Sequence, residues 1–163
     1  MGRQLFPLLE MMRLRSGPQD LPASPGITLL LAALYITSGF VAGGVLDEAD
    51  YGERTLVSVA LQFIVAGILL NVRGLQSRLL QTVAALAGTG LLFGLASIGI
   101  LSWINPEQPQ AGLAVSYLGL FLWSLAVDGH IYRNALSIRL GTGVLLAVTV
   151  FAINLFVLKA LFG

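Results

Sequence analysis

Five long apolar runs constrain this chain more than any other feature of its sequence. A hydrocarbon core about 30 Å thick is crossed by roughly 20 apolar residues in a helix that rises about 1.5 Å per residue. The runs cover residues 27–46, 55–72, 79–103, 111–132 and 140–162. None contains a proline, so each can satisfy its backbone hydrogen bonds internally, as lipid demands. The sequence therefore predicts an all-α polytopic membrane bundle of five transmembrane helices.

Short polar segments separate the runs. The first is acidic, with Asp47, Glu48, Asp50 and Glu53, and the second carries Arg73 and Arg78. The third holds Pro106 and Pro109, and the fourth is bounded by Arg133 and Arg139. The acidic link lacks the spacing of a calcium loop, so we expect a solvated connection. The last link, residues 133–139, is the least polar, but Arg133 and Arg139 would be costly at mid-bilayer and therefore divide two helices.

The basic residues sort to one side of the predicted bundle. With the N-terminus in the cytoplasm, the cytoplasmic segments carry Arg3, Arg13, Arg15, Arg73, Arg78, Arg133 and Arg139. The opposite side keeps Arg54 and Lys159. Because cytoplasmic segments are enriched in basic residues, this bias predicts a cytoplasmic N-terminus and a C-terminus outside. Trp103 at an outer helix end and Tyr132 at an inner one suit interfacial aromatic belts.

The composition excludes several classes of protein. The 163 residues are 56% hydrophobic and 10% charged, far more apolar than an average soluble domain. The absence of cysteine excludes disulfides, thiolate metal sites and cysteine nucleophiles. The net charge of +1 argues against a nucleic-acid partner. Eight arginines against a single lysine are typical of a GC-rich bacterial genome, so the bacterial inner membrane is the expected location.

Residues 1–26 form a tail ahead of the transmembrane domain, residues 27–163. Residues 4–15 fit an amphipathic helix on the inner leaflet, with the apolar positions Leu5, Leu8, Leu9, Met11 and Met12 opposite the polar positions Arg3, Glu10 and Arg13. A disordered leader that only carries positive charge is the alternative.

The end of the tail holds three prolines in eight residues, which excludes a helix there. One interpretation is a device for starting the first membrane helix, with Ser24 as the N-cap and Pro25 in the first turn. The other is a rigid cytoplasmic loop, the GPQDLP stretch of residues 17–22, that tucks under the bundle and presents Asp20.

The chain resembles the Yip1-like membrane proteins, and among them small proteobacterial inner-membrane members. The features that carry the resemblance are the GPQDLPAS stretch, the five spans, the cytoplasmic N-terminus and the very short C-terminal tail. Eukaryotic relatives carry Asp-Leu-Tyr-Gly-Pro in the tail, whereas here Asp20-Leu21 is followed by Pro22 and preceded by Gly17-Pro18. The resemblance implies a five-span fold and a role in organising or assisting other membrane proteins or lipids.

Asp128 and His130 are the ionisable residues inside a predicted span, where such residues are expensive and are candidates for function. Residues two positions apart are separated by about 200° around a helix axis, so the two side chains do not face each other. We expect Asp128 about one turn inside the cytoplasmic boundary. Three interpretations of Asp128 follow: an ion pair with Arg73, Arg78 or Arg139, a site for a proton or ligand, or a side chain among the lipid headgroups. With Asp20 and Arg133, these residues form the candidate functional cluster.

Other polar and small residues in the spans are expected to hold helices together. Gln62 and Asn154 lie near mid-membrane and are predicted to hydrogen bond between helices. As part of a transport path they would instead need partners such as Thr89, Tyr35 or Ser38. Small residues at a spacing of four favour close helix packing. The positions concerned are Gly39 and Gly43, Gly90 and Gly94, and in the last span Gly141, Gly143 and Ala147. Packing within the chain, a homodimer face and a hinge in the third span are the alternatives for these glycines.

The sequence carries no catalytic, metal or cofactor motif, so we expect a protein that is not an enzyme. The first hypothesis is an inner-membrane protein that organises membrane proteins or lipids, as the resemblance implies. Its partners would be lipids and another membrane protein or a second copy of the chain. The alternative is a small transporter or channel for a proton-linked or lipid-like solute that uses Asp128 and His130.

Overall fold

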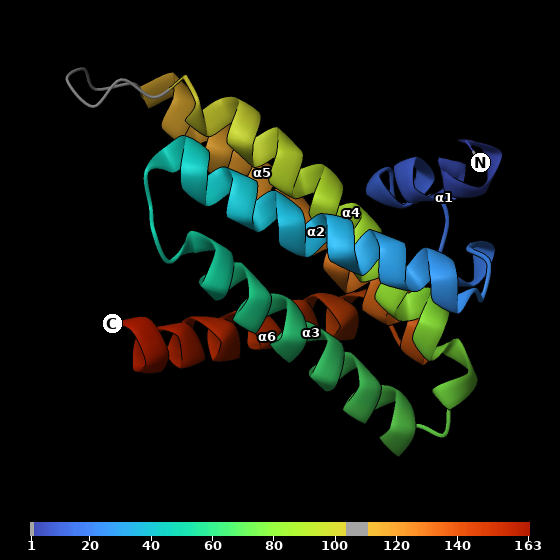
Figure 1. Ribbon diagram of the computed structural model, residues 1–163. Helices are drawn as coiled ribbons and strands as arrows, with labels where there is room; N and C mark the ends of the chain where they lie inside the picture. Colours follow the sequence, from blue (N-terminus) through green and yellow to red (C-terminus); the bar gives the residue numbers. More distant parts are fainter. Residues whose placement is uncertain (1, 104–110) are drawn as a thin grey trace.

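The computed structural model describes residues 2–103 and 111–163, with side chains from Phe6 onward. Five long helices dominate it (Figure 1): α2 Pro25–Leu46, α3 Tyr51–Val72, α4 Leu79–Leu101, α5 Ala111–Leu136 and α6 Leu140–Phe162. All five are long and apolar enough to cross a membrane. The predicted all-α, five-span fold is therefore confirmed, and the composition and hydropathy are those of a multi-pass membrane protein.

The helix boundaries differ from the predicted ones at four places. α2 begins at Pro25 rather than 27. α3 begins at Tyr51 rather than 55, and α4 ends at Leu101 rather than 103. α5 continues to Leu136, past the predicted end at 132, and leaves a link of only residues 137–139 before α6. Within this extension Asn134 Nδ2 donates to the carbonyl of His130 at 2.8 Å. The predicted proline link at residues 105–109 lies outside the described residues.

The first membrane helix starts as expected from its capping residues. The hydroxyl of Ser24 accepts a hydrogen bond from the amide of Ile27 at 3.4 Å, and Pro25 occupies the first helical turn. Directly after the last helical residue, Leu46, Asp47 adopts the left-handed conformation with φ 55°. The turn at residues 47–50 then reverses the chain into α3.

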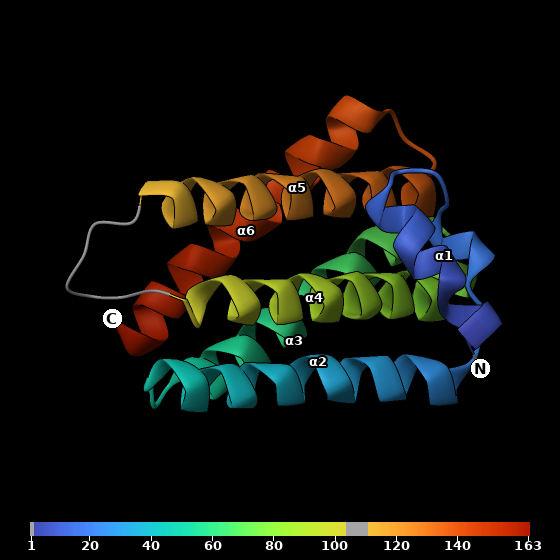
Figure 2. The ribbon, with the colours of Figure 1, turned by 90° about the horizontal axis from the view of Figure 1, so that it is seen from above.

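α4 is the central helix, lying between α2 and α5, while α3 and α6 cross the bundle beside them (Figure 2). Its residues Ala84, Ala85, Leu86, Ala87, Gly88 and Thr89 are all buried. Most of the predicted small-residue positions lie in close contacts between helices. Gly39 lies against Thr55, Gly90 against the ring of Tyr35, and Gly94 near Ser38.

Gly141 and Tyr132 do not have the surroundings that the sequence predicted for them. Gly141 has open space where a side chain would be, whereas Gly143, predicted together with it, packs closely on the backbone of α5 at Gly129. Tyr132, predicted as an interfacial anchor, is only 1% exposed, because α5 extends past it and the bundle encloses its ring. Trp103 is 77% exposed, as a lipid-facing or interfacial residue would be.

The tail contains a helix, α1 Gly2–Met12, and a 3₁₀ turn, η1 Pro18–Asp20. α1 lies against α4 and α5 (Figures 1 and 2). Among the described side chains of α1, Leu8 and Met11 are buried, with Leu8 over Gly88 of α4, whereas Leu9 is half-exposed. The apolar face that was predicted to lie on lipid is therefore divided, and its buried part packs on protein.

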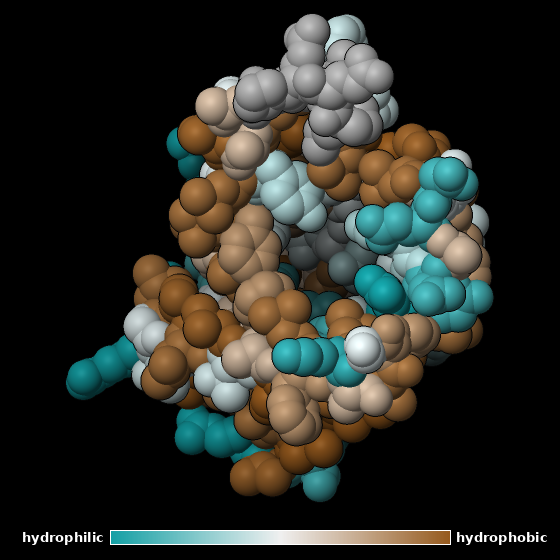
Figure 3. Space-filling view, turned by 90° about the vertical axis from the view of Figure 1, so that its left-hand side faces the viewer, coloured by the Kyte–Doolittle hydropathy of each residue, from teal (hydrophilic) through white to brown (hydrophobic). Residues whose placement is uncertain are grey.

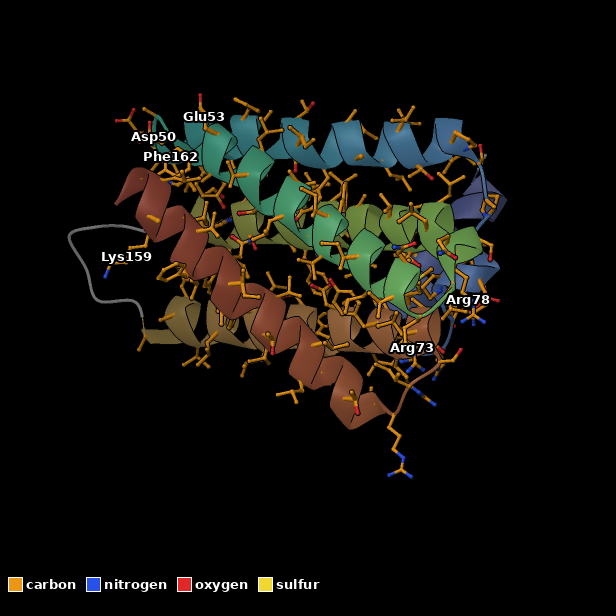
Figure 4. The ribbon with its side chains drawn as sticks, turned by 90° about the horizontal axis from the view of Figure 1, so that it is seen from below. Asp50, Glu53, Arg73, Arg78, Lys159 and Phe162 are labelled. Atoms are coloured by element: carbon orange, nitrogen blue, oxygen red, sulfur yellow. The ribbon has the colours of Figure 1, made fainter. Side chains whose placement is uncertain are left out.

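The two ends of the bundle carry opposite charges. Figure 4 shows Asp50, Glu53 and Lys159 at one end and Arg73 and Arg78 at the other. We call the first the acidic end and the second the arginine-rich end, which also holds Arg133 and Arg139 where α5 ends and α6 begins. Arg54 at the acidic end is held over the ring of Phe162, 5.7 Å from its centroid.

Candidate functional site

A cavity of about 470 Å³ opens at the acidic end and runs inward between the five long helices. Figure 3 looks onto this end of the molecule and shows the hollow surrounded by apolar and polar side chains. Glu48, Tyr51 and Arg54 lie at its mouth, where α2 turns into α3. The cavity is lined by hydroxyl, amide and carboxyl groups as well as aromatic rings, which is the composition of a site for a small molecule.

Asp128 lies at the inner end of this cavity. It lies eight residues before Leu136, the last residue of α5. At about 1.5 Å per residue this places it roughly 12 Å inside the helix end, rather than the single turn predicted from the sequence. The longer α5 is the reason for the difference.

The partner of Asp128 is an amide and not an arginine. Gln62 Nε2 on α3 donates to Asp128 Oδ2 at 3.2 Å. Among the described residues the one ion pair is that between Arg13 and Glu10, so the predicted pairing of Asp128 with Arg73, Arg78 or Arg139 is wrong. The arginines lie at the helix ends, too far out to reach a carboxylate two turns inside.

A second polar pair lies along the same cavity wall. Ser58 Oγ donates to Asn154 Oδ1 at 2.9 Å, and Asn154 Nδ2 donates back to the carbonyl of Ser58 at 3.3 Å. This pair joins α3 to α6, while Gln62 joins α3 to α5. The prediction that Gln62 and Asn154 hydrogen bond between helices is therefore confirmed, and both also line the cavity.

A smaller cavity of about 140 Å³ shares the same inner wall, including Asp128, Gln62 and Tyr35. It adds Tyr132, whose hydroxyl is buried and has no hydrogen-bond partner among the described residues. A buried hydroxyl without a partner is unfavourable by about 1–3 kcal/mol. It is also a donor and acceptor that a polar solute beside Asp128 could use.

His130 faces away from this cavity, toward the tail. Its ring is 5% exposed, and Nε2 lies 3.0 Å from the carbonyl oxygen of Ser16, so an N–H at this position donates to that carbonyl. As the spacing on α5 predicted, His130 and Asp128 do not share a face. They therefore do not act on one solute together.

The GPQDLP loop is held between α4 and α5. Gln81 Nε2 on α4 donates to the carbonyl of Leu21 at 2.8 Å, and η1 within the loop also contacts α5. Ahead of the loop, Trp123 Nε1 on α5 donates to the carbonyl of Met12, the last residue of α1, at 2.9 Å. Asp20 is exposed, and its Oδ2 accepts the amide of Gly17 at 2.8 Å. The Asp20 carboxylate thus closes its own loop and does not approach Asp128.

Arg133 is exposed at the arginine-rich end, where it borders a separate polar pocket together with Arg78. The predicted cluster is thus divided into three places: Asp128 in the cavity, His130 with Asp20 around the loop, and Arg133 on the surface. In the part of the chain that the structure describes, no three histidine, aspartate or glutamate side chains gather as metal ligands.

The sequence did not single out the residues at the mouth and along the wall of the cavity. Tyr51 and Arg54 were assigned to a link, and Tyr35 and Ser38 were named only as possible partners of Gln62 and Asn154. A signal existed in the spacing, since Gln62, Ser58 and Thr55 recur every three to four residues on one face of α3. Comparisons with family models, curated proteins and solved structures find no match to this chain.

Proposed function

We propose that this chain is a non-enzymatic, multi-pass protein of a bacterial inner membrane, with its arginine-rich end in the cytoplasm. The separation of charge between the two ends supports this orientation, because basic residues favour the cytoplasmic side. The acidic end and the mouth of the cavity would then face outward.

We further propose that the protein binds a small polar solute in the cavity and carries it through the membrane. The observation that carries this proposal is the Asp128 carboxyl group, which ends a cavity of about 470 Å³ inside a membrane-spanning bundle. A carboxyl group in such a position is expensive, and the amide of Gln62 alone compensates for little of that cost. An ionisable side chain in so unfavourable a position is most simply explained by a functional role.

The groups around Asp128 favour a solute that carries positive charge or donates hydrogen bonds. A carboxylate accepts hydrogen bonds only, and Ser58 and Asn154 offer further oxygens on the same wall. Tyr35 and Phe93 add aromatic rings, which attract cations. A protonated amine, or a proton taken up by Asp128 itself, meets these requirements. His130 has no part in this proposal.

Single-cysteine labelling tests the proposal without knowledge of the solute, because the chain has no cysteine of its own. Ser124→Cys places a thiol one turn from Asp128 on the cavity wall, and Thr149→Cys places one on the exposed face of α6 as the matched control. Both variants are reconstituted in liposomes and treated with a trimethylammonium and a sulfonate thiosulfonate reagent, neither of which crosses the membrane.

The expected result is labelling at position 124 from the acidic end, at least about tenfold faster with the cation than with the anion, which corresponds to about 1.4 kcal/mol. Adding Asp128→Asn should remove most of this preference, while Thr149→Cys should stay unlabelled. Equal protection of both thiols would exclude an open cavity. A preference that survives Asp128→Asn would exclude the carboxyl group as its cause.

The Yip1-like role in organising other membrane proteins is the second candidate. It is favoured by the exposure of Gln19 and Asp20, which leaves part of the GPQDLP loop accessible at the arginine-rich end. Affinity purification in mild detergent tests it with two variants. Asp20→Ala removes the charge and the hydrogen bond to Gly17, whereas Asp20→Asn removes the charge and keeps an acceptor. A stoichiometric membrane protein lost in both would support this role, and none in wild type would exclude it.

A further inference from the structure

A second pocket, of about 460 Å³, lies at the arginine-rich end and is separate from the cavity that holds Asp128. It is formed where the GPQDLP loop, the start of α4 and the end of α5 meet. Its polar lining consists of Gln19, Arg78, Gln81, Arg133, Asn134 and Ser137. This lining combines two guanidinium groups with amide and hydroxyl groups, and no carboxylate belongs to it.

The guanidinium group of Arg78 is held in place by the chain itself. Its Nη1 donates to the carbonyl of Ala135 at 2.9 Å and to Ser137 Oγ at 2.8 Å, with a longer bond to the carbonyl of Asn134. These acceptors form the C-terminus of α5, where the partial negative charge of a helix end favours a cation. The other two nitrogens of the Arg78 group have no partner among the described residues.

The charge of this pocket is not neutralised by a neighbouring acid. Neither Arg78 nor Arg133 makes an ion pair within the described part of the chain. The nearest carboxyl group in sequence to the lining is that of Asp20, which does not line the pocket and is bonded to the amide of Gly17. Arg133 is exposed and has no hydrogen-bond partner among the described residues, so its donors are available.

We propose that this pocket binds a negatively charged phosphate group. The planar fork of arginine matches the oxygens of a phosphate, and two such groups beside the Gln19 amide and the Ser137 hydroxyl can hold one anion from several sides. The pocket lies at the ends of α4 and α5, the depth at which lipid headgroups meet a membrane protein. The phosphate therefore belongs to an anionic phospholipid or to a soluble phosphate ester.

The bound phosphate would also hold the tail against the bundle. Gln81 lines the pocket and at the same time donates to the carbonyls of Leu21 and, at 3.3 Å, Gln19. Gln19 itself belongs to the lining. An anion that engages Arg78 and Arg133 beside these amides would therefore join the GPQDLP loop to the end of α5. This proposal does not depend on the use of the Asp128 cavity.

Binding measurements on the purified full-length protein in dodecyl maltoside test the proposal, with native mass spectrometry for lipids and calorimetry for soluble ligands. The probes are phosphatidylglycerol, zwitterionic phosphatidylcholine and glycerol 3-phosphate. Arg133→Gln removes one exposed guanidinium group from the pocket. Arg139→Gln is the matched control, because Arg139 is also exposed at this end but does not line the pocket.

We expect Arg133→Gln to weaken binding of an anionic probe by about tenfold, since a charge-assisted hydrogen bond is lost, and Arg139→Gln to leave it unchanged. Binding of phosphatidylglycerol alone would identify a lipid site, and equal binding of glycerol 3-phosphate would identify a soluble phosphate ester. The proposal is overturned if no anionic probe binds, if phosphatidylcholine binds as tightly as phosphatidylglycerol, or if the two arginine variants behave alike.

Discussion

Between the helices, the arginine-rich half of the bundle is packed with side chains, and its polar pocket lies outside this core, at the helix ends. The acidic half instead encloses a cavity of about 470 Å³, although the same five helices form both halves. In the filled half the residues Ala84–Thr89 of α4 and Val127, Ile131 and Tyr132 of α5 are buried. In the hollow half α4 presents Gly94 and Ser97 to the cavity. The helices therefore do not determine by themselves whether the space between them is filled.

The tail accounts for much of the difference. Met11 and Leu21 bring large apolar side chains into the filled half, and both are buried completely or almost so. At the other end the turn between α2 and α3 contributes the polar and charged residues Glu48 and Tyr51 to the cavity mouth. We infer that the segment before the first membrane helix acts as a packing element for one half of the bundle only.

Truncation of Met11 should have the largest effect of the changes considered, because its side chain is 0% exposed. We expect Met11→Ala to lower the free energy of unfolding by about 2–5 kcal/mol, the usual range for a large residue in a core. Thermal unfolding in detergent, followed by circular dichroism, measures it. Leu9→Ala is the control on the same helix, and because Leu9 is half-exposed we expect a change within about 0.5 kcal/mol.

A similar loss for Met11→Ala and Leu9→Ala would contradict this account of the tail. It would mean that α1 contributes through general contact with detergent or lipid and that its buried face has no special part in filling the bundle.

Adding volume to α4 should distinguish the two halves directly. Ala85→Leu forces three extra carbon atoms into a site that is 0% exposed, and overpacking of this kind destabilises by about 1–3 kcal/mol. Ser97→Leu adds a larger side chain to the same helix where it lines the cavity, so we expect stability within about 0.5 kcal/mol of wild type. Unfolding in detergent compares the two, and equal losses would show that the cavity closes in solution.

The bond between His130 and Ser16 should contribute less than Met11 to holding the tail. His130→Phe keeps a ring of similar size and removes the donor to the Ser16 carbonyl, at a cost of about 1–1.5 kcal/mol. Tryptic cleavage at Arg13 and Arg15 then reports on opening of the tail, and we expect it to become about fivefold to tenfold faster. The same rate in wild type and variant would show that the hydrogen bond does not hold the tail.

The fold was predictable because membrane thickness sets the length of an apolar helix, and five runs of that length leave few alternatives. The direction in which each side chain points was not. α2–α6 are apolar on all sides, so their sequences give little indication of which face meets protein and which meets lipid. That is why Tyr132 was assigned to an interface, and why Gly141 was assigned to a packing face together with Gly143 and Ala147, although only the latter two are packed.

The partner of Asp128 was missed for a related reason. A search for opposite charge led to the arginines, whereas inside the bundle the available partner was the neutral amide of Gln62 on a neighbouring helix. Helix boundaries added to the error, since α5 extends to Leu136 and carries Asp128 deeper than expected. By contrast, the spacing of Asp128 and His130 correctly placed them on different faces, because it depends only on the geometry of one helix.

The smallest effect considered concerns the pair Ser58 and Asn154 in the hollow half. A double-mutant cycle with Ser58→Ala, Asn154→Ala and the double variant isolates the bond between the Ser58 hydroxyl and Asn154 Oδ1. The bond from Asn154 Nδ2 to the backbone carbonyl of Ser58 survives Ser58→Ala and therefore does not enter the coupling. Bonds of this kind between membrane helices contribute about 0.6 kcal/mol on average and rarely more than about 1.7. Because the pair borders the cavity, water can replace a lost partner, and we expect a coupling at the lower end of that range. A coupling near 1.7 kcal/mol would instead indicate that this wall of the cavity is dry, and a dry wall is incompatible with labelling of Ser124→Cys by charged reagents.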